Sequence, residues 1–191
     1  IRWYAISYVT GILLSWFFIL KIIKIKKIDI DNQTISELIS NCIIGIILGG
    51  RLGYVTFYNY EYFSDNLLEI FKIWNGGMSF HGGLIGVIIA VIYTSKTSKT
   101  SLMLLADLVA IVSPVGIFFG RIANFVNGEL YGRVTTHPFG IIFPNGGNIP
   151  RHPSQLYEAF FEGLLLFLIL LIFLQFEKII KNSGVLAGCF I

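Results

Sequence analysis

Four groups of polar residues interrupt an otherwise apolar sequence, and their types could bind and transform a polar substrate. They are Arg51 within 49–53, His81 within 79–86, the run 120–133 and the stretch 151–162. An Arg or Asp near the centre of a bilayer costs about 2.5–3.5 kcal/mol on insertion scales. Each such group therefore calls for a reason, and most of them lie toward one half of the membrane.

The run 120–133 is the most informative of the four. If its first part is helical, Arg121 and Asn124 share a face because they are three residues apart. Gly128 would end the helix and let Glu129 fold back toward that face. The arginine fork suits phosphate oxygens, and the amide could bridge an ester carbonyl or hold the carboxylate. The alternative is an ion pair between Arg121 and Glu129 that only joins helices.

His81 is expected near the outer end of its span, beside glycines that let a backbone or a ligand come close. A neutral imidazole there could accept a proton. The alternatives are a hydrogen bond between helices for His81 and close packing for Gly82, Gly83 and Gly86. Tyr4, at the start of the first span, could belong to a site or to an aromatic belt.

The stretch 151–162 places two carboxylates on one helix face. Gln155, Glu158 and Glu162 fall at i, i+3 and i+7 and are expected to face inward. Two ionised glutamates four residues apart repel, so at least one should have a cationic partner or stay protonated. Arg151 or His152 could act on a headgroup or serve as an interfacial anchor.

The elements that position these residues are membrane-spanning helices. The chain has 191 residues, of which 55% are hydrophobic and 13% charged, and its mean hydropathy is +0.76. About 20 apolar residues cross a hydrocarbon core about 30 Å thick. We predict an all-α polytopic membrane protein, a single integral domain over 1–191. Its five spans are placed at about 3–23, 35–58, 77–93, 102–125 and 154–176, and a sixth begins at Gly184.

Lysine clusters predict the orientation of these spans. Four lysines lie between 21 and 27, two lie at 96 and 99, and two lie at 178 and 181, so all fall on one side, which the positive-inside rule makes cytoplasmic. The segments 61–72 and 129–151 are then outside. The net charge of +3 forms no stripe on a soluble face, so no nucleic-acid partner is expected. No cleavable signal peptide is recognised.

Signatures of other enzyme classes are missing from the sequence. There is no GxSxG, HExxH or P-loop, and the histidines and cysteines lack metal-ligand spacing, so neither a metal nor a cofactor is expected. Two rivals from other classes remain: a transporter or channel with broken helices, and a phospholipid hydrolase, for which no nucleophile sits beside a base.

The polar motifs resemble those of the prolipoprotein diacylglyceryl transferases. The family signature Gly-Arg-x-x-Asn-Phe-x-Asn-x-Glu-x-x-Gly is matched from Gly120 to Gly132 without a gap. Further matches lie at 2–4, 49–54, 76–86 and 151–158, so the resemblance covers essentially all of the chain.

The resemblance implies a seven-helix enzyme of the bacterial inner membrane with a small periplasmic head. Its donor would be phosphatidylglycerol, its acceptor the lipobox cysteine of a prolipoprotein, and its by-product glycerol-1-phosphate. It also implies roles for six residues of this chain: Tyr4, His81, Arg121, Asn124, Glu129 and Gly132. The family's last part would lie beyond Ile191, so the chain is expected to be a fragment, truncated at both ends.

These inferences give a hypothesis for the mechanism. His81, helped by Glu129 or Tyr4, would take the proton of the acceptor thiol, whose reference pKa is near 8.5. The thiolate would attack the glycerol carbon that bears the phosphate ester, and Arg121 would neutralise the departing phosphate. The substrate-binding set that we predict is Arg121, Asn124, Gly132, Arg51 and Glu158.

Overall fold

The computed structural model describes residues 3–176 and 182–191, and the chain divides into two compact units. One unit comprises Ile1–Lys27 and Ala106–Ile191, and the other comprises Ile28–Leu105. Within the described ranges every regular element is a helix, and extended pairing is limited to two isolated bridges near Arg151. The predicted all-α class is therefore confirmed.

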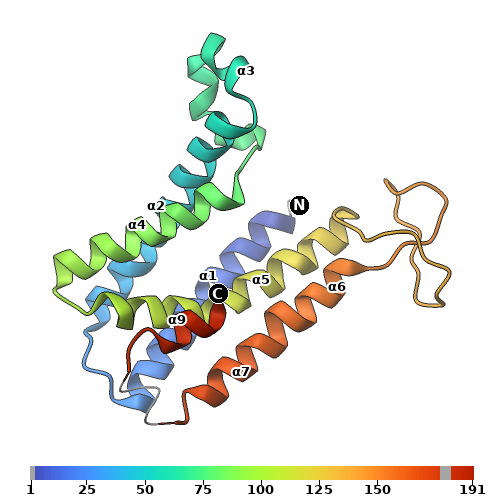
Figure 1. Cartoon of the computed structure of the whole chain (residues 1–191). Coiled ribbons are helices and arrows are strands. Elements are labelled where there is room, and N and C mark those ends of the chain that lie inside the picture. The colour runs from blue at the N-terminus through green and yellow to red at the C-terminus, as the bar shows by residue number, and fades with distance from the viewer. Residues whose placement is uncertain (1–2, 177–181) are drawn as a thin grey trace. The chain divides into compact units, whose positions relative to one another are not determined.

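Among the described residues, five helices are long and apolar enough to cross a membrane (Figure 1). They are α1 (Trp3–Lys26), α2 (Asn32–Phe57), α4 (Phe80–Ser98), α5 (Leu102–Asn127) and a composite helix made of α6 (Ser154–Glu158), η3 (Ala159–Leu165) and α7 (Leu166–Phe173). The short helix α9 (Val185–Phe190) starts after Gly184, where a sixth span was predicted to begin. The predicted Lys178 and Lys181 cluster lies outside the described residues.

In the unit of α1, α5 and the composite helix, small residues allow close contact between antiparallel helices. A Cβ atom added to Gly11 of α1 would lie 3.3 Å from the Cα atom of Gly116 in α5. Four residues further along α1, the Ser15 hydroxyl donates a hydrogen bond to the Val112 carbonyl at 3.4 Å. Near the start of α5, the buried carboxylate of Asp107 accepts hydrogen bonds from the amides of Gly184 and Ala187 and so caps the N-terminus of α9.

In the unit of residues 28–105, α2 and α4 are antiparallel and pack along glycines. Gly45 and Gly49 of α2 lie directly against Gly86 and Gly82 of α4, and an added Cβ at any of these positions would overlap a carbonyl oxygen of the facing helix. Such small-residue seams let helix backbones approach closely in membranes. Close packing, which the sequence left open as a reason for the glycines after His81, is therefore observed for Gly82 and Gly86 but not for Gly83.

The third span begins three residues later than the predicted residue 77. Gly76 and Gly77 both have a left-handed φ, +83° and +81°, which a helix does not accept. Ser79 then caps α4, because its hydroxyl accepts a hydrogen bond from the amide of Gly82. The preceding segment holds three short helices, α3 (Tyr60–Asp65), η1 (Leu67–Phe71) and η2 (Ile73–Asn75).

Candidate active site

Arg121, near the end of α5, pairs with two carboxylates of the composite helix. Its Nε atom lies 2.8 Å from Glu158 Oε2, and its Nη2 atom lies 3.8 Å from Glu162 Oε2. The expectation that at least one of these glutamates has a cationic partner is confirmed. The alternative in which Arg121 forms its ion pair with Glu129 is wrong for the described residues, because a neighbouring helix supplies the acidic partners instead.

A π-helical segment, η3, presents these glutamates to Arg121. The sequence predicted a membrane-spanning helix at about 154–176, and within it residues Ala159–Leu165 form the wider π turns. Gly163 in this segment lies against α5, where an added Cβ would be 2.7 Å from the Cβ atom of Phe118. π-Helical turns inside α-helices occur frequently at functional sites. Here the segment brings its helix close to α5 at the level of Arg121.

Glu129 turns back toward the last turn of α5, as predicted. Gly128 ends the helix with a left-handed φ of +66°, and the amide of Glu129 donates to the carbonyl of Asn124 at 3.1 Å. The next residue, Leu130, also has a left-handed φ, +56°, which is unfavourable for a side chain of its kind. The carboxylate of Glu129 is thus placed by a tight, strained turn.

A chain of hydrogen bonds joins the Glu129 carboxylate to the first helix. The hydroxyl of Tyr4 donates to Glu129 Oε1 at 2.6 Å and accepts a hydrogen bond from the buried amide of Asn124. Asn127 donates to the same carboxylate oxygen at 3.0 Å. Tyr4 therefore belongs to this polar cluster, and its role in a substrate site stays a prediction.

Two residues that the predicted site did not include support the same turn. Gln155 of α6 is fully buried and donates from Nε2 to the carbonyl of Glu129 at 2.6 Å, while the Ser154 hydroxyl donates to the carbonyl of Leu130 at 3.0 Å. The other polar atom of Gln155, Oε1, is buried without a partner among the described residues, which is unfavourable. The sequence did contain a signal for Gln155: a polar amide near the start of the predicted helix, on the same face as Glu158.

Gly132 and Arg151 fold the loop that follows the Glu129 turn. The amide of Gly132 donates to the carbonyl of His152 at 2.9 Å, and a Cβ added there would be 3.0 Å from the Cβ atom of His152. Arg151 donates to the carbonyl of Gly146 and lies over the ring of Tyr131 at 5.0 Å. Both residues are engaged in loop structure, so a direct contact of Gly132 with substrate stays a prediction.

His81 and Arg51 belong to the unit of residues 28–105. His81 is exposed in the first turn of α4, and Arg51 is buried on α2. The structure thus brings together Tyr4, Asn124 and Glu129 and pairs Arg121 with Glu158, whereas the meeting of His81 with these groups stays a prediction. No cluster of three or more His, Cys, Asp or Glu side chains in the described parts is arranged to hold a metal ion.

Comparison with known proteins assigns this arrangement to a family. The sequence pattern of the prolipoprotein diacylglyceryl transferases matches residues 1–191. The chain belongs to this family. The expectation drawn from the motif in 120–132 is therefore confirmed, and the chain is a multi-pass membrane transferase of the prolipoprotein diacylglyceryl transferase family.

Individual members of the family are similar along the whole chain. The phosphatidylglycerol–prolipoprotein diacylglyceryl transferase of Rickettsia akari (strain Hartford) is 52% identical over 191 residues, which are 100% of this chain and 74% of that protein. The transferase of Rickettsia bellii (strain OSU 85-389) is 53% identical over 192 residues, 73% of its length. That of Rickettsia felis is 51% identical over 191 residues, 74% of its length. The transporter and hydrolase alternatives are set aside.

Proposed function

We propose that this chain, as one integral membrane catalytic domain, transfers the sn-1,2-diacylglyceryl group of phosphatidylglycerol to the lipobox cysteine of prolipoproteins. The products are a thioether-linked lipid and glycerol-1-phosphate, and the reaction is the first step of bacterial lipoprotein maturation. Family membership and the relatives' names support this assignment. The structural observation that carries it is the hydrogen-bonded cluster of Tyr4, Asn124 and Glu129 within an otherwise apolar helical unit.

The reaction requires a base for the acceptor thiol. With a reference pKa near 8.5, the thiol is mostly protonated at neutral pH, so a base raises the reactive thiolate fraction. We assign the proton to His81, assisted by Glu129 or Tyr4. The sulfur then forms a bond to the glycerol carbon that bears the phosphate ester. The carbon–oxygen bond breaks, and its electron pair leaves with the phosphate oxygen.

Arg121 is the group that we assign to the departing phosphate. Glu158 holds its Nε side at 2.8 Å and so fixes the plane of the guanidinium, whose remaining N–H groups suit phosphate oxygens. Glu158 would then act on substrate binding through Arg121 rather than by direct contact. In a site of low dielectric, a fixed cation stabilises the negative charge that develops on the leaving group.

The lipid donor explains why the enzyme resides in a membrane. Each methylene of the two acyl tails opposes departure from the bilayer by about 0.8 kcal/mol, so the donor enters sideways between helices. We place the site toward the periplasmic side of the bacterial inner membrane. In support, Lys24 and Lys26 occupy the last turn of α1, the end opposite to Tyr4.

Mass spectrometry of an acceptor peptide tests the proposal. Incubation of the full-length enzyme with phosphatidylglycerol and a lipobox peptide should add the diacylglyceryl mass to the cysteine. Arg121→Ala and Glu129→Ala should abolish the adduct while the protein stays folded, because each removes a charged group of the site. Glu37→Ala, which removes an exposed hydrogen bond to Gln33, serves as the matched control and should retain transfer. Wild-type turnover in either site variant would refute these roles.

A further inference from the structure

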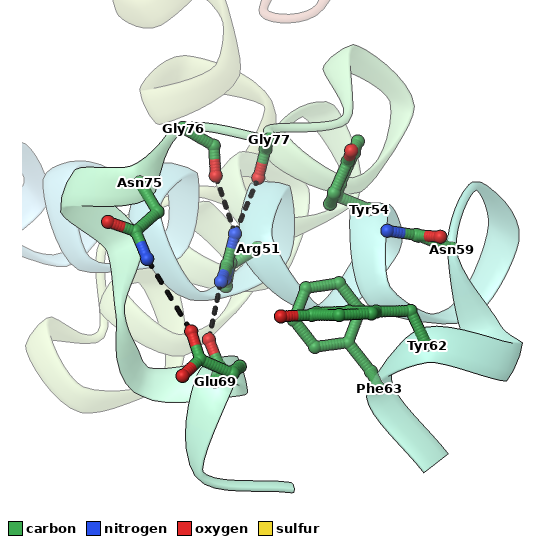
Figure 2. A pocket seen from close by; sticks show the side chains of 9 residues that line it. All are labelled: Arg51, Tyr54, Asn59, Tyr62, Phe63, Glu69, Asn75, Gly76 and Gly77. Atoms are coloured by element: carbon green, nitrogen blue, oxygen red, sulfur yellow. Dashed lines mark hydrogen bonds between the residues drawn. The ribbon is translucent and has the colours of Figure 1, made fainter. Parts of the chain in front are cut away.

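The side chain of Arg51 is buried and surrounded by main-chain carbonyl groups (Figure 2). Its Nε atom donates to one carbonyl at 2.8 Å, its Nη1 atom to two at 2.6 and 3.2 Å, and its Nη2 atom to two at 2.6 and 3.3 Å. In that order the acceptors belong to Ile70, Gly76, Gly77, Glu69 and Lys72. All five lie in the segment that connects α3 to α4.

These hydrogen bonds use the whole donor capacity of Arg51. A guanidinium carries five N–H donors and no acceptor, and here five carbonyls receive them. The face of the group is also covered, because its central carbon lies 5.0 Å from the ring centre of Phe63. Although Arg51 lines a cavity of about 170 Å³, it has no N–H left for a phosphate. This geometry argues against the predicted role of Arg51 in substrate binding.

The segment that Arg51 holds leads directly into the turn that carries His81. Gly76 and Gly77, whose carbonyls accept from Arg51, have left-handed φ angles that reverse the chain. Two residues later, the amide of Ser79 donates to the carbonyl of Gly50 at 2.8 Å. Gly50 and Arg51, which are adjacent in α2, therefore hold the two ends of the 76–79 turn. His81 follows within the first turn of α4.

We infer that Arg51 is a positioning residue that fixes the 69–79 segment and thereby the place of His81. This inference rests on the proposed function, in which His81 accepts the thiol proton. A lysine at position 51 would keep the charge, but its ammonium offers three donors on a flexible stem instead of a planar fork of five. A lysine therefore cannot make the same five hydrogen bonds, although it carries the same charge.

Steady-state kinetics of the full-length enzyme distinguish positioning from lipid binding. Arg51→Gln and Arg51→Lys should lower kcat at least about tenfold. They should leave KM for phosphatidylglycerol within about twofold, because neither substitution removes a contact with the bound lipid. Lys72→Gln is the matched control: it removes a cation of the same segment together with its solvent-accessible ion pair to Glu69, which contributes little, and it keeps the main-chain carbonyl. It should leave both constants unchanged. A raised KM with an unchanged kcat would overturn the inference.

A double-mutant cycle tests whether Arg51 acts through His81. If it does, Arg51→Gln should lower kcat in the wild-type background and have little further effect beside His81→Gln. Multiplicative losses would show that Arg51 acts independently and would contradict the inference. The His81→Gln enzyme alone reports on the proposed function, since wild-type turnover there would remove His81 as the base whatever Arg51 does.

Amide hydrogen exchange gives a measurement that does not depend on turnover. Arg51→Gln and Arg51→Lys should accelerate exchange at the amides of 69–79, whereas Lys72→Gln should not, and the amides of α1 and α5 should be unaffected in all three proteins. Unchanged protection of 69–79 in both Arg51 variants would mean that the five hydrogen bonds do not hold the segment.

Discussion

The hydroxyl of Tyr4 links a carboxylate and an amide that come from the other end of the sequence. It donates to Glu129 and accepts from Asn124, so both of its hydrogen-bonding functions are used inside the cluster. A hydrogen bond to a charged group contributes about 1.5–3 kcal/mol. Loss of this hydroxyl should therefore disturb the orientation of Glu129 without creating a large cavity.

We predict that Tyr4→Phe lowers kcat/KM about 10- to 100-fold while the unfolding temperature changes little. The control is Tyr8→Phe, because Tyr8 stands one turn further along α1, stacks on Tyr4 with a centroid separation of 6.4 Å and is 62% exposed. It should retain full activity. Transfer to a lipobox peptide, followed by mass spectrometry, measures both. Equal losses in the two variants would show that the effect is not specific to the hydroxyl of Tyr4.

Side-chain positions that depend on local backbone rules could be predicted from the sequence. Positions that depend on contacts with other helices could not. The return of Glu129 follows from a glycine that accepts a left-handed φ at a helix end, and it was found as expected. The partner of Arg121 depends on how α5 and the composite helix approach each other. Spacing along one helix cannot reveal that approach, so Glu158 and Glu162 came to light as its partners only in three dimensions.

At the scale of elements, the pairing of α2 with α4 depends on glycines that face each other at helical spacing. Gly45 and Gly49 are four residues apart, as are Gly82 and Gly86, and each glycine opposes a main-chain carbonyl of the partner helix. A methyl group at such a position forces the backbones apart. Overpacking of this kind typically costs about 1–3 kcal/mol.

We predict that Gly86→Ala lowers the unfolding midpoint of the purified protein in detergent by roughly 2–12 °C, the shift that such a loss produces in a chain of this size. Gly83→Ala is the matched control in the same helix. A Cβ at Gly83 meets only the carbonyl oxygen of Ile46 at 3.8 Å, an ordinary contact. Alanine also favours helix more than glycine does, so Gly83→Ala should be neutral or stabilising. An unchanged unfolding midpoint for Gly86→Ala would contradict the close packing of α2 against α4.

Length and apolar content located the five spans, because a helix that crosses lipid must satisfy its own backbone. The start of α4 and the π-helical form of η3 were not foreseen. The first reflects two consecutive glycines with positive φ, which are held by tertiary contacts that spacing along the chain does not reveal: hydrogen bonds from Arg51 and packing of Gly77 against Tyr54. The second accompanies the contact of Gly163 with Phe118, which lies on another helix.

At the scale of the whole molecule, the alternation of five spans sets which segments share a side of the membrane. The connection between α1 and α2 is short and follows Lys24 and Lys26, whereas the segment between α2 and α4 is rich in aromatic residues. Basic loops favour the cytoplasmic side, and aromatic residues favour interfaces. The two segments should therefore be separated by the bilayer.

We predict that a membrane-impermeant maleimide labels Asp65→Cys in intact spheroplasts and labels Asp29→Cys only after the membrane is opened. Both positions are exposed aspartates outside the long helices, so intrinsic reactivity should be comparable. Replacement of Cys42 and Cys189 by serine provides the background. Labelling of Asp29→Cys in intact spheroplasts would invert the proposed orientation and place the site on the cytoplasmic side.

The attachment of the 69–79 segment to Arg51 has a consequence for divergence of its sequence. All five acceptors are main-chain carbonyls, which every amino acid carries. The side chains at 69, 70 and 72 can therefore change without removal of an acceptor. Gly76 and Gly77 are the exceptions, because their positive φ angles disfavour a side chain.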